Sequence, residues 1–232
     1  MMELNLKKNM TYSESEIYDL VKKKKNDISK QSFKWILYQL EQNGITSRIG
    51  TQRYITGLTK YQYESSEKFK DIKDYLNRTF PDVDYVVWES VQLNEWINFL
   101  INLNTIYIEV EKELFDFVVD GLMGEFSDKY TILINPDEET ISRYRRDDLV
   151  IIKKLFSRSP IDKKKHNIKL EKLMIDLLCD KNYISMIDSS AIEDIYAGVK
   201  KTYAIDVTKM MNYAKRRGVF NKASELWGLD ND

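Results

Sequence analysis

The sequence contains little of what marks secreted, membrane-spanning or flexible proteins. Its 232 residues include a single cysteine, Cys179, which excludes a disulfide framework and indicates a reducing compartment. No apolar run approaches the roughly 18 residues that a membrane helix needs, and the N-terminus lacks the apolar segment of a signal peptide. With 8 glycines and 3 prolines, the chain contains no low-complexity linker. We therefore expect a cytoplasmic protein that does not contact a membrane.

The short motifs that carry much of enzyme chemistry are also missing. The chain has no glycine-rich phosphate loop, no Gly-x-Ser-x-Gly and no cysteine–histidine spacing for zinc. Its one histidine, His166, stands in the lysine-rich stretch DKKKHN, where we expect a loop residue rather than a general base. The sequence therefore predicts a protein without catalytic residues, cofactor or metal.

One set of carboxylates keeps a nuclease open as the alternative function. Asp82 and Asp84 precede a predicted strand, and Glu109 and Glu111 end the next one. A metal-dependent nuclease needs an acidic residue with a lysine two positions later, to hold Mg²⁺ and orient water. Glu111 occupies the position where that lysine is required, and Lys112 follows one residue too late. Solvated or salt-bridged strand ends are the better interpretation.

Residues 11–57 have the pattern of a winged helix-turn-helix. Ser13 with Glu16 forms a capping box at the start of a short helix, and Ser29 caps a second one. The second helix carries apolar residues at helical spacing, namely Phe33, Ile36, Leu37 and Leu40. Two β-rich pieces around Gly50 then predict a hairpin. In proteins with such a unit, the second helix can lie in the major groove of DNA.

The polar face of the second helix is the candidate DNA-binding surface. It lies opposite Phe33 and holds residues that can bond phosphates or base edges or pack on sugars, namely Lys30, Gln31, Lys34, Trp35 and Tyr38. Arg48 and Arg53, on the two arms of the hairpin, are expected to contact phosphate. Residues 1–60 hold 11 basic and 6 acidic side chains, whereas the remainder holds 25 and 31. A basic N-terminal region followed by an acidic remainder is typical of a nucleic-acid-binding protein with a second function.

The rest of the chain predicts a mixed α/β body with a helical tail. Four pieces rich in Val, Ile and Tyr are expected strands, at Asp84–Trp88, Thr105–Val110, Tyr130–Ile134 and Leu149–Lys153. Helical patterns cover Glu67–Arg78, Val91–Ile101, Glu113–Phe126 and Asp137–Arg145. The predicted fold class is α+β with partly parallel strands. We expect a DNA-binding domain at 1–60 and a C-terminal domain at 61–232, whose α/β body spans about 61–157 and whose helical tail spans about 158–232.

The order of several segments resembles the antitoxins of the AbiE abortive-infection systems. The matching pieces are FKWILYQLEQNGITSRIGTQRYI, VWESVQLNEW, IEVEKE, ILINPDEE, KKLFSRSP, LEKLMIDLLCDK and MMNYAKRRG. They span roughly residues 11–217. The hairpin departs from the Gly-Arg-Gly-x-Tyr that is frequent in that family, because Gly50-Thr51-Gln52-Arg53-Tyr54 lacks the second glycine.

The resemblance implies an antitoxin that is also a transcriptional autorepressor in a phage-defence operon. Its winged helix would bind operator DNA, and its C-terminal domain would neutralise a nucleotidyltransferase-like toxin. Basic clusters beyond the predicted strands are typical of helix-end charge. Combined with the resemblance, they indicate a surface for an acidic partner, either the toxin or the nucleic acid on which it acts. The residues of this expected partner surface are Arg158, Lys215, Arg216 and Arg217.

Overall fold

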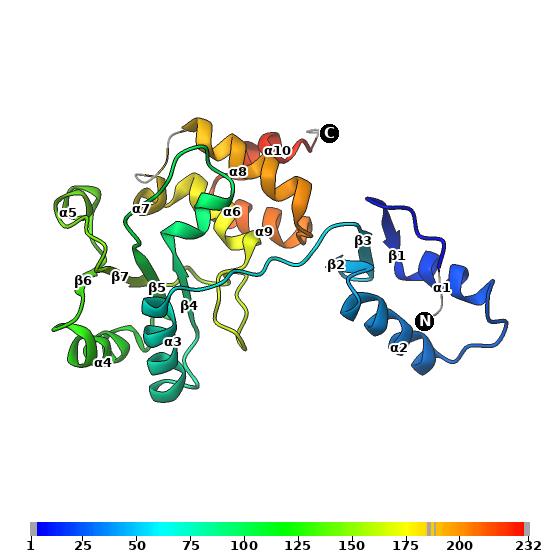
Figure 1. The fold of residues 1–232 in the computed structure, drawn as a ribbon, viewed down its shortest axis with the longest axis horizontal. Helices are drawn as coiled ribbons and strands as arrows, with labels where there is room; N and C mark the ends of the chain where they lie inside the picture. The colour runs from blue at the N-terminus through cyan, green and yellow to red at the C-terminus, as the bar shows by residue number, and fades with distance from the viewer. Residues whose placement is uncertain (1–3, 185–186, 188, 230–232) are drawn as a thin grey trace.

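A computed structural model describes residues 4–184, 187 and 189–229, and it shows a mixed α+β protein with two small sheets (Figure 1). The predicted α+β class is thus confirmed. None of the helices in this described part of the chain has the length and apolar character needed to cross a bilayer.

The N-terminal unit, residues 4–57, combines two helices with a three-stranded antiparallel sheet. Its elements are β1 (Thr11–Ser13), α1 (Glu14–Lys22), α2 (Lys30–Gln42), β2 (Thr46–Gly50) and β3 (Arg53–Thr56), with the strand order β1-β3-β2. Ser13 and Glu16 form the expected capping box, and the Ser29 hydroxyl accepts from the backbone N–H of Ser32 at 3.1 Å. Both predicted helices and the hairpin are confirmed.

The C-terminal unit, residues 67–229, is built on a four-stranded sheet. Its strands are β4 (Tyr85–Glu89), β5 (Ile106–Val110), β6 (Thr131–Ile134) and β7 (Leu149–Lys154), in the order β4-β5-β7-β6. β4 is antiparallel to β5, whereas β5, β7 and β6 run parallel. The four predicted strands and their partly parallel pairing are confirmed.

Helices cover both faces of this sheet (Figure 1). α3 (Glu67–Thr79) and α4 (Phe115–Phe126) pack their apolar sides on one face, where Val87, Ile108 and Ile152 are buried. The other face carries Trp88, Tyr107 and Ile151 and is covered by the C-terminal helices. These are α6 (Leu170–Cys179), α7 (Lys181–Ile184), α8 (Ser189–Thr202), α9 (Val207–Arg217) and α10 (Phe220–Trp227).

Two predicted helices differ from the structure. The helix expected over Val91–Ile101 was wrong: only a 3₁₀ turn, η1 (Ser90–Glu95), forms there. The Asn94 side chain accepts from Ile101 N at 2.8 Å and donates to Ile101 O at 3.1 Å, and this bonding stabilises a loop instead of a helix. The helix expected over Asp137–Arg145 is shorter, since α5 (Glu138–Arg143) is capped by Asp137, whose carboxylate accepts from Thr140 N at 2.8 Å.

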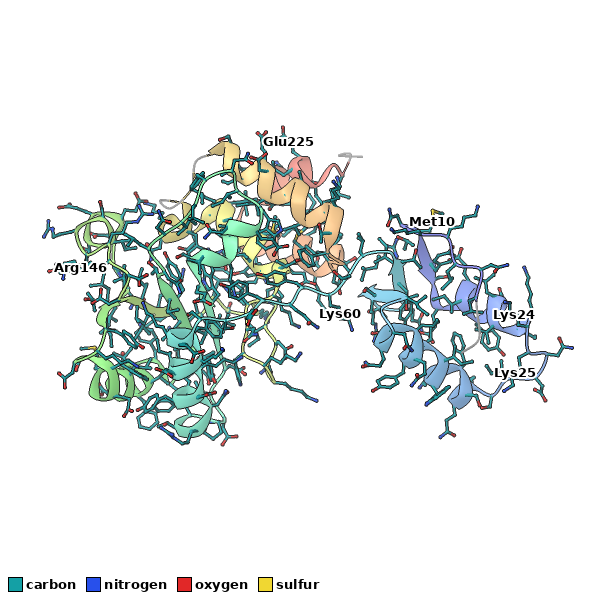
Figure 2. The ribbon with its side chains drawn as sticks, viewed as in Figure 1. Met10, Lys24, Lys25, Lys60, Arg146 and Glu225 are labelled. Carbon is teal, nitrogen blue, oxygen red and sulfur yellow. The ribbon has the colours of Figure 1, made fainter. Side chains whose placement is uncertain are left out.

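The two units have separate apolar cores and meet at a short junction. Residues 58–66 connect them, and Lys60 lies where the chain passes from one unit to the other (Figure 2). Thr59 pairs with the end of α8 through backbone bonds, Thr59 N to Thr202 O at 3.1 Å and Ala204 N to Thr59 O at 2.8 Å. The hairpin strand β2 also contacts α9. The junction therefore places β2 beside the C-terminal helices.

Candidate functional site

The outward face of α2 carries all five helix residues that the sequence singled out. Lys30, Gln31, Lys34, Trp35 and Tyr38 are exposed, with 62% of Trp35 and 56% of Tyr38 accessible to solvent. Steps of 100° per residue place these five side chains within a continuous arc of the helix. The two aromatic rings lie on the same side of α2 as the two lysines.

The opposite face of α2 fixes that orientation. Phe33, Leu37 and Leu40 are 5% exposed or less and pack with residues of α1 and β3. The ring of Tyr18 meets Phe33 edge-on at 5.0 Å between centroids. The predicted core of this helix is confirmed, and with it the rotation that turns Trp35 outward.

Arg48 and Arg53 stand on the neighbouring strands β2 and β3, and both are exposed. The Arg48 guanidinium Nε donates to Gly50 O at 3.0 Å, which holds this side chain along the hairpin. Gln52 in the turn has φ of +56°, the left-handed conformation that glycine adopts with least strain. The hairpin thus keeps a left-handed turn residue although the sequence offers no second glycine.

Within the described ranges, no ion pair engages Lys30, Lys34 or Arg53. Glu41, at the far end of α2, bonds Lys60 at 3.1 Å instead. The α2 face and the hairpin together form a positively charged surface with two exposed aromatic rings.

The residues of the expected partner surface differ in their exposure to solvent. Arg158, Lys215 and Arg216 are exposed, and the Arg216 guanidinium donates to Arg158 O at 2.7 Å. Arg217 is largely buried: it lies 3.4 Å from Asp176, donates to the Cys179 sulfur and stacks over Phe156. Of the four residues expected to contact a partner, Arg158, Lys215 and Arg216 are therefore exposed, whereas Arg217 is engaged in the interior.

The interior of the C-terminal unit contains a cluster of buried charged side chains between the four-stranded sheet and the C-terminal helices. Lys172 of α6 donates to Glu109 of β5 at 2.7 Å and to Asp176, one turn further along α6. All three residues are 2% exposed or less. Tyr183 donates to Glu109 at 2.6 Å and Tyr213 to Asp176 at 2.9 Å, so the carboxylates have hydrogen bonds beyond the lysine.

Electrostatics explain how these charges persist in the interior. Burial alone raises the pKa of Glu109, but the ammonium groups of Lys172 and Lys153 outweigh it and lower the pKa to about 2. Burial also lowers the pKa of Lys172, yet its two carboxylate partners outweigh that effect and raise the pKa above its usual value. Burial dominates at Asp176 and raises its pKa. Glu109 and Lys172 are therefore a charged pair at neutral pH.

The carboxylates considered for a nuclease do not converge on one site. Asp84 pairs with Lys163 at 2.5 Å, and Glu111 accepts from the backbone N–H of Asp84, whereas Glu109 belongs to the buried cluster. The expected ion pairing is confirmed for Asp84 and Glu109. In the described part of the chain, no group of three histidine, cysteine or acidic side chains is arranged to hold a metal.

His166 is a loop residue, as predicted, but it is 6% exposed rather than a solvated member of the lysine-rich turn. Its ring stacks on Tyr85 at 4.0 Å between centroids, and its Nδ1 lies 3.2 Å from Tyr85 O. Packing on the tyrosine accounts for its burial.

The fold and these sites define a two-unit α+β protein with a basic surface at one end. Residues 32–230 match the model of the Family of unknown function (DUF6577), and the chain belongs to this family. A comparison with curated proteins found no match. The matched range begins within α2 and includes the hairpin and the whole C-terminal unit up to residue 230.

Proposed function

We propose that this protein binds duplex DNA through its N-terminal unit, which acts as a winged helix. α2 enters the major groove, and the β2–β3 hairpin is the wing that reaches flanking phosphates. One observation carries the proposal: the solvent face of α2 presents Lys30, Lys34 and two large exposed aromatic rings, and no carboxylate in the described ranges pairs with these lysines.

The side chains suit separate parts of a duplex. Lys34 and Arg53 would neutralise phosphates, and Gln31 has the amide needed for base edges. Trp35 and Tyr38 would pack on sugars or on the methyl group of thymine. A docking site for another protein would be expected to have fewer unpaired cations in its centre, because interface cores are depleted of lysine.

The resemblance to AbiE antitoxins extends the proposal to a regulatory role. In this role the protein represses its own operon in the cytoplasm, and its C-terminal unit neutralises a nucleotidyltransferase-like toxin. The exposed group Arg158, Lys215 and Arg216 is the proposed contact for the toxin or for the nucleic acid on which it acts, since Arg bonds phosphate or carboxylate in bidentate fashion.

The alternative, a metal-dependent nuclease, fits the arrangement of side chains less well. Mg²⁺ requires carboxylate oxygens that are open to water and substrate. Glu109 is buried, and the Lys172 ammonium occupies the space between it and Asp176. This occupied site favours a binding protein over a nuclease.

The DNA-binding proposal is tested with the promoter of the protein's own operon. Lys34→Ala with Arg53→Ala should weaken binding and reduce the slope of log Kobs against log salt by about 0.9 for each lost phosphate contact. Because both side chains are exposed, the melting temperature should change little. Lys112→Ala with Lys201→Ala, two exposed lysines of the C-terminal unit, is the matched control. A normal promoter shift by the first double variant would contradict the assignment of this face.

The antitoxin role is tested by growth rescue when the full chain is co-expressed with the toxin encoded beside it. Arg158→Ala or Arg216→Ala should weaken rescue while promoter binding stays unchanged. Rescue that equals the wild type in both variants would remove these residues from the proposed partner surface.

A further inference from the structure

A cleft of about 860 Å³ lies where the two units meet. One wall comes from the last turn of α2 and from β2, which contribute Glu41 and Arg48. The opposite wall comes from the segment before α6 and from the start of α9, with Lys165, Lys169 and Lys209. Basic side chains from both units therefore face one space.

The acidic residues of this cleft are engaged within the chain. Glu41 bonds Lys60, Asp162 accepts from two backbone N–H groups, Glu171 accepts from Asp206 N, and Asp206 caps α9. In contrast, neither Lys165 nor Lys169 forms an ion pair with any described residue. The charges of both lysines help to lower the pKa of Asp162, but their ammonium groups form no ion pair with a described residue and can bind an added phosphate.

The cleft continues the surface that α2 presents. Lys34 and Glu41 are seven residues apart, two helical turns, so they lie on the same side of α2 at about 10 Å along its axis. The outward face of α2 therefore leads to the cleft, because Glu41 is one of the residues that line it. In the view of Figure 1, α2 and the segment between β7 and α6 both project toward the lower side of the molecule.

We propose that the C-terminal unit contributes a second phosphate-binding site for the same duplex, formed by Lys165 and Lys169 across the cleft from Arg48. This inference rests on the proposed DNA binding. A duplex seated on α2 would pass the cleft, where the phosphates that flank the bound site would meet these lysines. Lys165 and Lys169 would contact phosphates and not base edges, so they would lengthen the stretch of DNA that the protein covers without changing its sequence preference.

Salt dependence tests this proposal with the full chain. Lys165→Gln with Lys169→Gln keeps most of each aliphatic stem and removes two charges. For promoter DNA, the slope of log Kobs against log salt should fall by about 1.8. Sequence preference, measured against a mutated operator, should stay the same. Lys165→Arg with Lys169→Arg should restore the slope, and Lys112→Gln with Lys201→Gln is the matched control.

Shortening the DNA locates the contact. Removing base pairs stepwise from each end of the promoter duplex should weaken wild-type binding at one end, while the Lys165→Gln/Lys169→Gln variant should be insensitive to the same cut. Equal slopes and equal length dependence in wild type and variant would overturn the second site and leave binding through α2 intact. A wild-type protein that binds no promoter duplex would overturn both proposals.

Discussion

The two units use charge in opposite ways. In the N-terminal unit a small apolar core lies beneath a helix whose cations and aromatic rings face water. In the C-terminal unit the sheet is covered on both faces, and Glu109, Lys172 and Asp176 lie inside. The exposed charges are available to a partner, whereas the buried charges are each other's partners.

This difference separates binding from stability. An exposed cation has lost little hydration, so its removal changes the free energy of unfolding only slightly. A buried ion has lost its hydration and depends on its neighbours, so its removal leaves the remaining charges uncompensated. Substitutions of the exposed cations of α2 should therefore affect binding, whereas substitutions within the buried cluster should affect folding.

The largest expected effect follows from the buried lysine. Lys172→Met should reduce the free energy of unfolding by about 3–5 kcal/mol, because Glu109 and Asp176 would remain buried without the ammonium group that bonds both, and of these two carboxylates Arg217 contacts only Asp176. Urea denaturation followed by circular dichroism measures the loss. The matched control is Arg143→Met, which breaks the exposed pair with Glu139 and should cost about 0.5 kcal/mol or less.

A triple variant separates charge from packing. Lys172→Met combined with Glu109→Gln and Asp176→Asn keeps hydrogen-bond acceptors for Tyr183 and Tyr213 and removes the three charges of the cluster, while Arg217 keeps Asp180 as an acidic neighbour at 3.9 Å. We expect it to recover much of the stability that the single variant loses. A triple variant as unstable as Lys172→Met alone would show that shape, not charge, determines the contribution of the cluster.

The second prediction compares the two faces of α2. Leu40→Ala should cost about 2–5 kcal/mol, since Leu40 is 3% exposed in a small core, and DNA binding should be lost through unfolding of the N-terminal unit. Trp35→Ala should cost far less stability but weaken DNA binding. Hydrogen exchange of residues 14–42, measured by mass spectrometry, reports the local free energies. Equal destabilisation by both variants would contradict the orientation of α2.

The sequence was sufficient for α2 but not for the buried cluster. The spacing of Phe33, Leu37 and Leu40 defines one apolar side of a helix, and the outward position of Trp35 follows from local geometry alone. Glu109 and Lys172, in contrast, are 63 residues apart and meet only because α6 packs on β5. Such a contact depends on topology, which local patterns do not determine.

Two local signs pointed to the cluster nevertheless. Glu109 interrupts the apolar run of β5, all of which is buried, and such strands rarely hold a charge without a partner. Lys172 and Asp176 stand four residues apart in the apolar segment LEKLMIDLLC, the spacing of an intrahelical ion pair. The run of three cations at the end of α9 contains no sign that Arg217 is largely buried while its two neighbours are exposed, because adjacent cations have the same local pattern.

The smallest expected effect is a change in how the free energy of unfolding falls at acid pH. The pKa of Glu109 is lowered to about 2 in the folded protein from about 4.5 in the unfolded chain. The unfolded state therefore binds the proton first, and the stability that Glu109 contributes is complete above about pH 4.5 and lost as pH falls toward 2. Asp176 acts in the opposite direction, because its raised pKa lets the folded state take up its proton first.

Glu109→Gln should therefore reduce the loss of stability between pH 4.5 and pH 2 relative to the wild type, although the variant is less stable at pH 7. Urea midpoints measured across this range give the two slopes, and parallel slopes would show that Glu109 does not carry the acid sensitivity.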